Sequence, residues 1–254
     1  MTTSIRVSLV LLLISSANAD PFSLALETGA GVVSGQRAWE GQSAYFAVFP
    51  VLKAVYGPWE VNSIDQTLRY RFGEDSSDFS FNLGLGLRDE GYSASGVIAS
   101  RPESGVYDGY QSPEGELVGV VGFDYLYFHL GLSQDLSGQS EGLSTQAAIY
   151  LPLYLRDDIA TVYVGAGIGW QSAAYANALY GVAGSNVDAT VGRHAYRLTA
   201  TTSPFLSVDW LYSFNGSFQV NVSASAHQLD AQIVQSPLVG RENTTQISIT
   251  LVYR

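Results

Sequence analysis

Apolar and polar residues alternate one by one along several stretches of this chain. In residues 216–229, GSFQVNVSASAHQL, every second residue from Phe218 to Ala226 is apolar and the residues between them are polar. A period of two is typical of a β-strand with one apolar and one polar face. The pattern recurs at 78–88, 125–133, 161–170, 205–214 and 243–254. No window keeps a 3.6-residue period, so we expect no substantial helix.

The connections between these stretches alternate between short and long. Short turns are expected at 73–78, 123–125, 156–159 and 214–217, and longer connections at 103–116, 137–142, 171–203 and 230–243. Outer-membrane barrels join their strands in this way, with short periplasmic turns and longer outer loops. A soluble β-sandwich has no reason to sort its loops by length.

Counting back from the last strand, with the long loops outside, predicts ten strands. They are expected at 22–34, 59–72, 77–89, 115–123, 125–135, 142–155, 158–171, 204–214, 217–229 and 243–254. Residues 44–56 are left over, and they either extend the second strand or belong to a twelve-strand arrangement. Bacterial barrels have an even number of strands, which excludes eleven. We prefer ten.

Three features favour an apolar face that points outward into lipid. The alternating runs match the 9–11 residues of a tilted transmembrane strand, whereas soluble strands average about 5–6. Aromatic residues gather near strand ends, as in interfacial girdles. Charged residues lie mid-strand on polar faces, where lipid exposure would cost about 2–4 kcal/mol for Arg or Lys. The sequence therefore predicts an all-β, antiparallel, up-and-down transmembrane barrel in the cell outer membrane. A secreted sandwich or lipocalin-like barrel is the alternative.

The polar faces supply candidate residues for the lumen. We predict a lumen-facing polar network of Glu27, Arg69, Arg71, Arg88, His129 and Asp209. A barrel of about ten strands is narrow, and side chains nearly fill it. We therefore expect an interior plugged by ion pairs and not an open diffusion pore.

The N-terminus has the features of a secretory signal peptide. Arg6 precedes the apolar run 7–14, and Ala17-Asn18-Ala19 ends the segment. We predict a signal peptide at 1–19, cleavage after Ala19 and a barrel domain at 20–254. The apolar run is far shorter than the ~20 residues that span a bilayer as a helix.

Composition narrows the classes of partner and site. Charged residues make up 14% of the chain, against about 25% in average soluble proteins. The net charge is −11 and Lys53 is the single lysine, so no basic face for nucleic acid is expected. There is no cysteine, which excludes disulfides and thiolate metal sites.

Candidate catalytic residues are few. Of the three histidines, His129 shares a strand face with Ser133, but four residues at ~3.3 Å each place them about 13 Å apart. Metalloprotease, serine-hydrolase and phosphate-loop motifs are missing from the sequence. We expect no catalytic residue, no cofactor and no metal site. A lipid-hydrolysing barrel that uses His129 or His227 is an alternative.

Several motifs resemble the MipA/OmpV family of outer-membrane proteins, also called MltA-interacting proteins. The stretches that carry the resemblance are 165–182, 203–214 and 227–254, with Tyr180-Gly181-Val182, Leu229-Asp230 and Ser236-Pro237-Leu238-Val239 inside them; 70–73 and 137–153 also fit. The chain departs from the family by closing on Tyr253-Arg254, where the family ends on an aromatic residue.

The resemblance implies a role in binding other proteins and does not imply a catalysed reaction. Members of this family look like scaffolds that bring a murein-cleaving lytic transglycosylase together with a murein synthase at the outer membrane. Outer-membrane lipid is then the other partner, and no catalytic residue can be carried over. The alternative is a surface adhesin or a narrow solute channel that uses the outer loops 90–114, 171–203 and 230–242.

Overall fold

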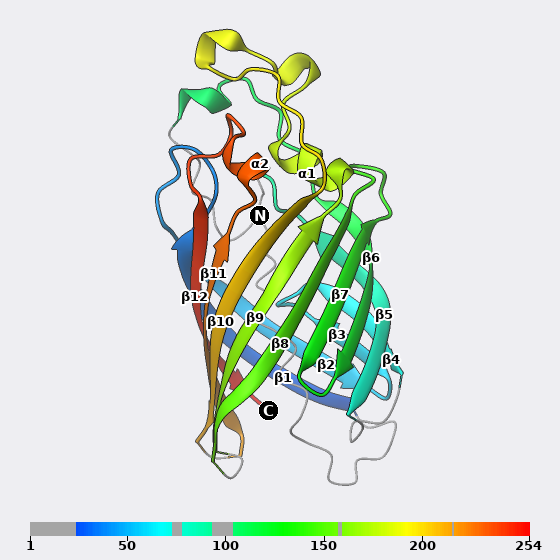
Figure 1. Cartoon of the computed structure of the whole chain (residues 1–254). Helices are drawn as coiled ribbons and strands as arrows, with labels where there is room; N and C mark the ends of the chain where they lie inside the picture. Colours follow the sequence, from blue (N-terminus) through cyan, green and yellow to red (C-terminus); the bar gives the residue numbers. More distant parts are fainter. Residues whose placement is uncertain (1–23, 73–77, 93–103, 157–158, 215) are drawn as a thin grey trace.

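The strands form one closed antiparallel barrel (Figure 1). The computed structural model describes residues 24–72, 78–92, 104–156, 159–214 and 216–254. The strands are β1 Leu24–Gln36, β2 Tyr45–Tyr56, β3 Trp59–Asn62, β4 Thr67–Phe72, β5 Phe79–Arg88, β6 Glu116–Tyr125, β7 Phe128–Asp135, β8 Leu143–Arg156, β9 Ala160–Gln171, β10 Thr201–Ser213, β11 Phe218–Gln228 and β12 Asn243–Tyr253. Each pairs with its neighbours in sequence, and β12 closes on β1. The predicted signal peptide and its cleavage site at Ala19 lie outside the described residues.

The preferred count of ten strands is corrected to twelve, the arrangement left open. The predicted strand at 59–72 is a hairpin of β3 and β4 around a tight turn. Gln66 has a φ of 54°, and the Asn62 side chain accepts a hydrogen bond from the Ile64 amide at 3.0 Å. The turn between β3 and β4 is as short as a periplasmic turn, so the length of the connection did not indicate that two strands are present here.

Strand β2 accounts for the residues left over at 44–56. Its outward residues Phe46 and Val48 are 65% and 54% exposed, while its inward residues Tyr45, Ala47, Phe49 and Val51 form a buried apolar cluster with Val33 and Val252. Both faces are therefore apolar. Alternation cannot reveal such a strand, because the two faces carry the same kind of side chain.

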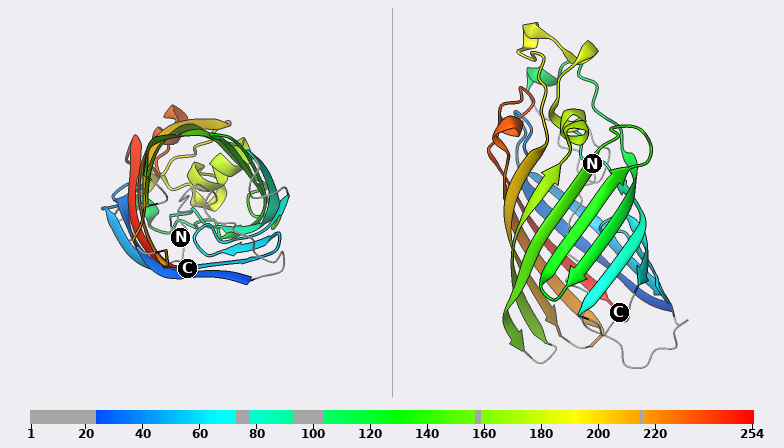
Figure 2. Two further views of the ribbon diagram at one scale, coloured as in Figure 1. Left: turned by 90° about the horizontal axis from the view of Figure 1, so that it is seen from below. Right: turned by 45° about the vertical axis from the view of Figure 1, so that its right-hand side comes forward.

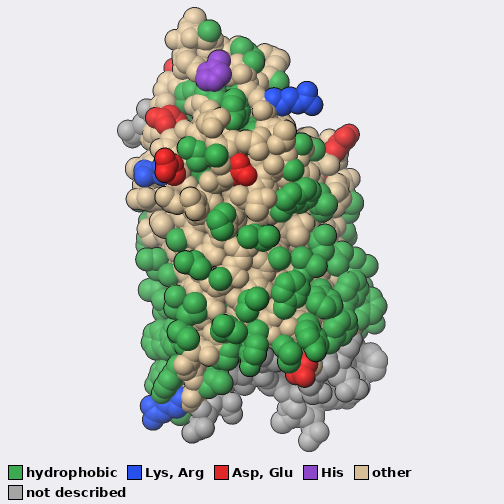
Figure 3. Space-filling model, viewed as in Figure 1, with side chains coloured by type: hydrophobic (Ala, Val, Ile, Leu, Met, Phe, Trp, Pro, Cys, Tyr) green, Lys and Arg blue, Asp and Glu red, His purple; other side chains and the backbone are tan. Residues whose placement is uncertain are grey.

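The outer wall of the barrel is apolar. Phe46, Leu153 and Leu206 are each more than 60% exposed, whereas Gln219 and Asn221 on the opposite strand face are buried. Figure 3 shows apolar side chains over the wall and charged ones near its ends. The described residues contain no helix long and apolar enough to cross a membrane. The outward-apolar prediction is confirmed, and a soluble barrel with an apolar interior is excluded.

Aromatic rings gather at the end of the barrel that carries the C-terminus and the short turns. One chain of ring contacts joins Trp59, Tyr70, Phe72 and Phe81, and another joins Trp210, Tyr212, Phe214, Phe218 and Tyr253. Aromatic residues prefer the membrane interface. This end is therefore the periplasmic boundary.

A cap of packed loops covers the opposite, outer end (Figure 2). It contains α1 Ala173–Tyr180, α2 Ala231–Val234 and the 3-10 turns η2 Gly105–Tyr107, η3 Gly184–Asn186 and η4 Ala189–Val191. Two buried clusters hold the cap together, one around Trp39, Tyr107 and Leu238 and one around Ala176, Leu198 and Ile233. The described parts of the three predicted outer loops thus meet in one folded unit.

Arg193 is the central tie of the cap. Its side chain is buried and donates hydrogen bonds to the backbone carbonyls of Asn186, Val106 and Asp108. The guanidinium also lies 5.6 Å from the centre of the Tyr110 ring. One side chain therefore joins the loop after β9 to the loop after β5.

Candidate functional site

A cluster of charged side chains lies in the lumen near the periplasmic end. Glu60 on β3 forms ion pairs with two cations: its Oε2 atom lies 3.8 Å from Lys53 Nζ and accepts a hydrogen bond from Arg71 Nη2 at 3.4 Å. All three side chains are largely buried. Charges at membrane depth are stable only when they are paired or hydrated, and the two ion pairs join the adjacent strands β2, β3 and β4.

Further polar pairs lie at several levels along the lumen. Arg254 Nε lies 3.1 Å from Glu27 Oε1, and Arg69 pairs with Asp65 in the turn before it. Asp209 accepts a hydrogen bond from Ser223 at 2.6 Å.

The six residues predicted for the lumen network all take part in polar contacts in the part of the chain that the structure describes. Glu27, Arg69, Arg71, Arg88, His129 and Asp209 each contact a partner outside that set. Their partners Glu60, Asp65, Glu116 and Asp124 were not predicted from the sequence. Cross-strand register would have found Glu116, which stands directly opposite Arg88, but register was not known. The role of the network stays a prediction.

Arg88 is the most highly connected of these residues. Its Nε donates to Glu116 at 2.9 Å, and its Nη atoms donate to Glu116, Ser144 Oγ and the carbonyls of Ser133 and Gly142. These contacts use all five donors of a guanidinium. The Tyr175 ring of α1 stacks on Arg88 at 3.7 Å, so the cap helix rests directly on the lumen wall.

The serine–histidine chemistry of a hydrolase is not assembled around His129. Its Nδ1 lies 2.7 Å from Asp124 Oδ1, and Ser80 donates to the other oxygen of Asp124 at 3.0 Å. In a catalytic triad the serine hydroxyl is hydrogen-bonded to the histidine. Here the Ser80 hydroxyl and the His129 imidazole both contact the carboxylate of Asp124 and not each other. In the part of the chain that the structure describes, no cluster of three or more His, Asp or Glu is placed to hold a metal ion.

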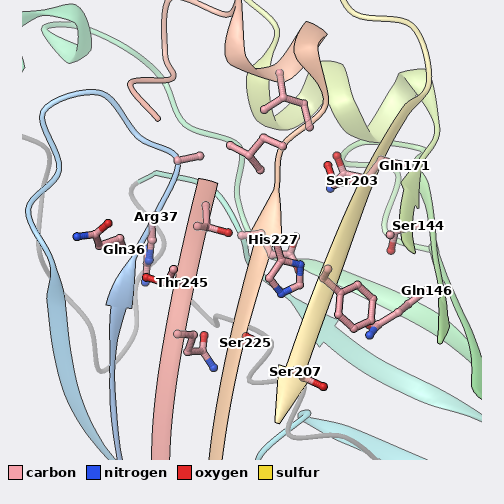
Figure 4. Close-up of a pocket in the computed structure, with 18 of the residues that line it drawn as sticks. Gln36, Arg37, Ser144, Gln146, Gln171, Ser203, Ser207, Ser225, His227 and Thr245 are labelled. Carbon is pink, nitrogen blue, oxygen red and sulfur yellow. The ribbon is translucent and has the colours of Figure 1, made fainter. Parts of the chain in front are cut away.

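Two cavities occupy the lumen above the charged cluster. The larger one, of about 260 Å³, lies beneath the cap and is lined mainly by hydroxyl, amide and aromatic side chains (Figure 4). The smaller one, of about 150 Å³, lies against β4 to β8 and includes Arg69, Arg88 and His129 among its lining residues.

The purified barrel is expected not to conduct ions steadily in planar bilayers. Paired charges line the lumen at one end and the packed cap covers the other, so we expect no wide water column between the two sides. Single-channel recording checks this expectation. Steady openings in the nanosiemens class, in preparations that migrate as the folded form on unheated gels, would contradict it.

Comparison with known proteins gives a family match over most of the chain. The model of a family described as MltA-interacting protein MipA matches residues 28–254. Two proteins named MltA-interacting protein, from Escherichia coli (strain K12) and Shigella flexneri, are each 28% identical over 130 residues. That alignment covers 51% of this chain and 51% of each relative, so the match spans about half the length of these relatives.

Solved barrels give only weak likenesses. Neisserial surface protein A is 8% identical, with 91% of this chain and 98% of that chain covered and a TM-score of 0.30. OprB of Pseudomonas putida is 7% identical, with 91% and 94% covered and a TM-score of 0.39. Both scores are below 0.5, so neither likeness supports a conclusion about function.

Proposed function

Because this outer-membrane barrel belongs to the MipA family of MltA-interacting proteins, we propose that it is an envelope scaffold without catalytic activity. It would hold a murein-cleaving lytic transglycosylase and a murein synthase at the inner face of the outer membrane. The family match over residues 28–254 carries this proposal.

The contents of the lumen support a scaffold over a channel. Glu60 with its two cations occupies the periplasmic end, and the cap packs over the outer end. A protein partner in the periplasm would therefore bind the rim of the barrel and its turns, which are the parts of the barrel wall that face the periplasm.

The turn between β6 and β7 is a suitable docking point on that rim. Its two residues, Leu126 and Tyr127, are 55% and 52% exposed at the periplasmic end. Leu126 has a φ of 51°, a conformation that costs a residue with a Cβ of order 1–3 kcal/mol. An exposed leucine held at such a position gains nothing for folding, which favours a role in contacting another protein.

Affinity capture from detergent extracts tests the scaffold. Tagged protein from outer membranes is expected to co-purify both a lytic transglycosylase and a murein synthase, identified by mass spectrometry. Migration before and after heating checks that the captured barrel is folded. The control is another scaffold protein that keeps its partners under the same conditions. Recovery of neither enzyme under these conditions would contradict the proposal.

A Leu126→Gly variant tests the docking point. Glycine adopts positive φ without strain, so the barrel should fold as well as the parent while capture falls at least roughly tenfold. Leu136→Gly is the matched control, because Leu136 is also 55% exposed but follows β7 at the outer end. Equal capture of the enzymes by both variants would show that Leu126 is not the docking point. The scaffold role would still be tested by the capture experiment with the parent protein.

A further inference from the structure

The larger lumen cavity has an aromatic wall built on glycines. An added Cβ on Gly165 would lie 2.6 Å from Tyr150 Cε1, and one on Gly167 would lie 2.7 Å from Phe205 Cε1. The rings of Tyr150 and Phe205 therefore pack directly on the backbone of β9. Both rings line the cavity, and the imidazole of His227 stacks on Phe205 with 5.1 Å between ring centres.

Uncharged hydrogen-bonding groups surround these rings. They come from four strands and include Gln146, Ser203, Ser207, Ser223, Ser225 and Gln246. Figure 4 shows Gln146, Ser207, Ser225 and His227 pointing toward a common space. Hydroxyl and amide groups both donate and accept hydrogen bonds, so this wall complements a ligand that does the same at many atoms.

Charge is nearly missing from the lining. Among its described residues, the ionised side chains are Arg37 and Glu90, one of each sign. The smaller cavity differs, since Asp65, Arg69, Arg88 and Glu90 all line it. A ligand with net charge would find no matching excess of the opposite charge in the larger cavity.

We propose that the larger cavity binds a neutral saccharide. A sugar ring presents hydroxyl groups around its edge and C–H groups on its faces, which match the hydroxyl and amide wall and the exposed parts of the aromatic side chains that line the cavity, Tyr150 and Phe205 among them. The volume of about 260 Å³ lies just below the roughly 300–1,000 Å³ of typical small-molecule sites, so it suits one or two sugar rings. This binding is independent of the scaffold function and of its periplasmic partners.

Saturation-transfer NMR on the folded protein in detergent tests the proposal. The probes are glucose, N-acetylglucosamine and maltose, with sorbitol as an open-chain polyol and glutamate as a charged solute. At least one saccharide is expected to bind with a Kd of about 1 mM or tighter, and neither control solute should match it. Binding of no saccharide, or equal binding of sorbitol or glutamate, would overturn the proposal.

Two matched substitutions on β11 locate the site. Ser225→Phe fills the cavity and is expected to weaken saccharide binding at least tenfold, whereas Ala226→Phe adds the same ring to the exposed lipid face and should leave binding unchanged. Phe205→Leu, which removes the ring on which His227 stacks but little volume, should also weaken binding. Migration on unheated gels confirms that each variant is folded. Full binding by both Ser225→Phe and Phe205→Leu would overturn the assignment of this cavity.

Discussion

Replacing Arg88 by methionine is expected to destabilise the folded barrel by about 3–5 kcal/mol, the cost of breaking a buried ion pair by removing one partner. Glu116 would be left as a buried carboxylate without its partner, and the Ser133 and Gly142 carbonyls would lose their donor. The Tyr175 ring would also lose the cation on which it rests. Urea titration in lipid vesicles, followed by gel migration, measures the loss as a lower unfolding midpoint.

Two further variants separate charge from geometry at this site. Arg88→Lys should recover little of the loss, since a lysine has three donors on one nitrogen and cannot replace five hydrogen bonds to four acceptor atoms. Combining Arg88→Met with Glu116→Gln removes the unpaired charge and should recover part of it. An Arg88→Met barrel within about 0.5 kcal/mol of the parent, the range of ordinary surface substitutions, would show that the network is not structural.

Replacing Arg193 by methionine is expected to open the cap while leaving the barrel folded. The substitution removes charged donors from the buried carbonyl of Val106 and from the partly buried contacts with the Asn186 and Asp108 carbonyls, and such hydrogen bonds are worth about 1.5–3 kcal/mol each. A loss of at least about 3 kcal/mol raises the open population of the cap roughly 100-fold. Chymotrypsin cleavage measures this change, because cleavage follows the open population when reclosing is fast.

Arg197→Met is the matched control for the cap. Arg197 lies in the same loop and is not buried, so the variant makes the same change in charge without removing a buried side chain. Arg193→Met should be cleaved near Tyr107, Tyr110 or Tyr196, while Arg197→Met resists like the parent. Similar cleavage of the two variants would mean that Arg193 does not hold the cap together.

The strand faces could be predicted from the sequence because their pattern is local. Phe218 to Ala226 alternate with polar residues, and the outward direction follows from strand length and from charges on the polar face. The family resemblance carried by residues such as Leu229-Asp230 and Ser236-Pro237 was confirmed over residues 28–254. None of these inferences required the order or the pairing of the strands.

The predicted number of strands was wrong where the alternation of apolar and polar residues gave no signal. Strand β2 is apolar on both faces, and β3 and β4 are joined by a turn too short to mark an outer loop. Only the pairing of β3 with both β2 and β4 shows that three strands lie where one or two were expected. The helices of the cap were missed for a related reason, since α1 and α2 are too short to establish a helical period.

The sequence by itself determined the class of the protein: a barrel with its apolar side toward lipid, polar residues in its lumen and the motifs of one family. The tertiary structure decided the partners within that lumen. Arg88 meets Glu116, Gly142 and Ser144 across 28, 54 and 56 residues of chain, and the cavity beneath the cap draws on strands far apart in sequence. Alternation with a period of two indicates which face of the strand a side chain lies on. Which other side chain it contacts depends on the register and closure of the whole sheet.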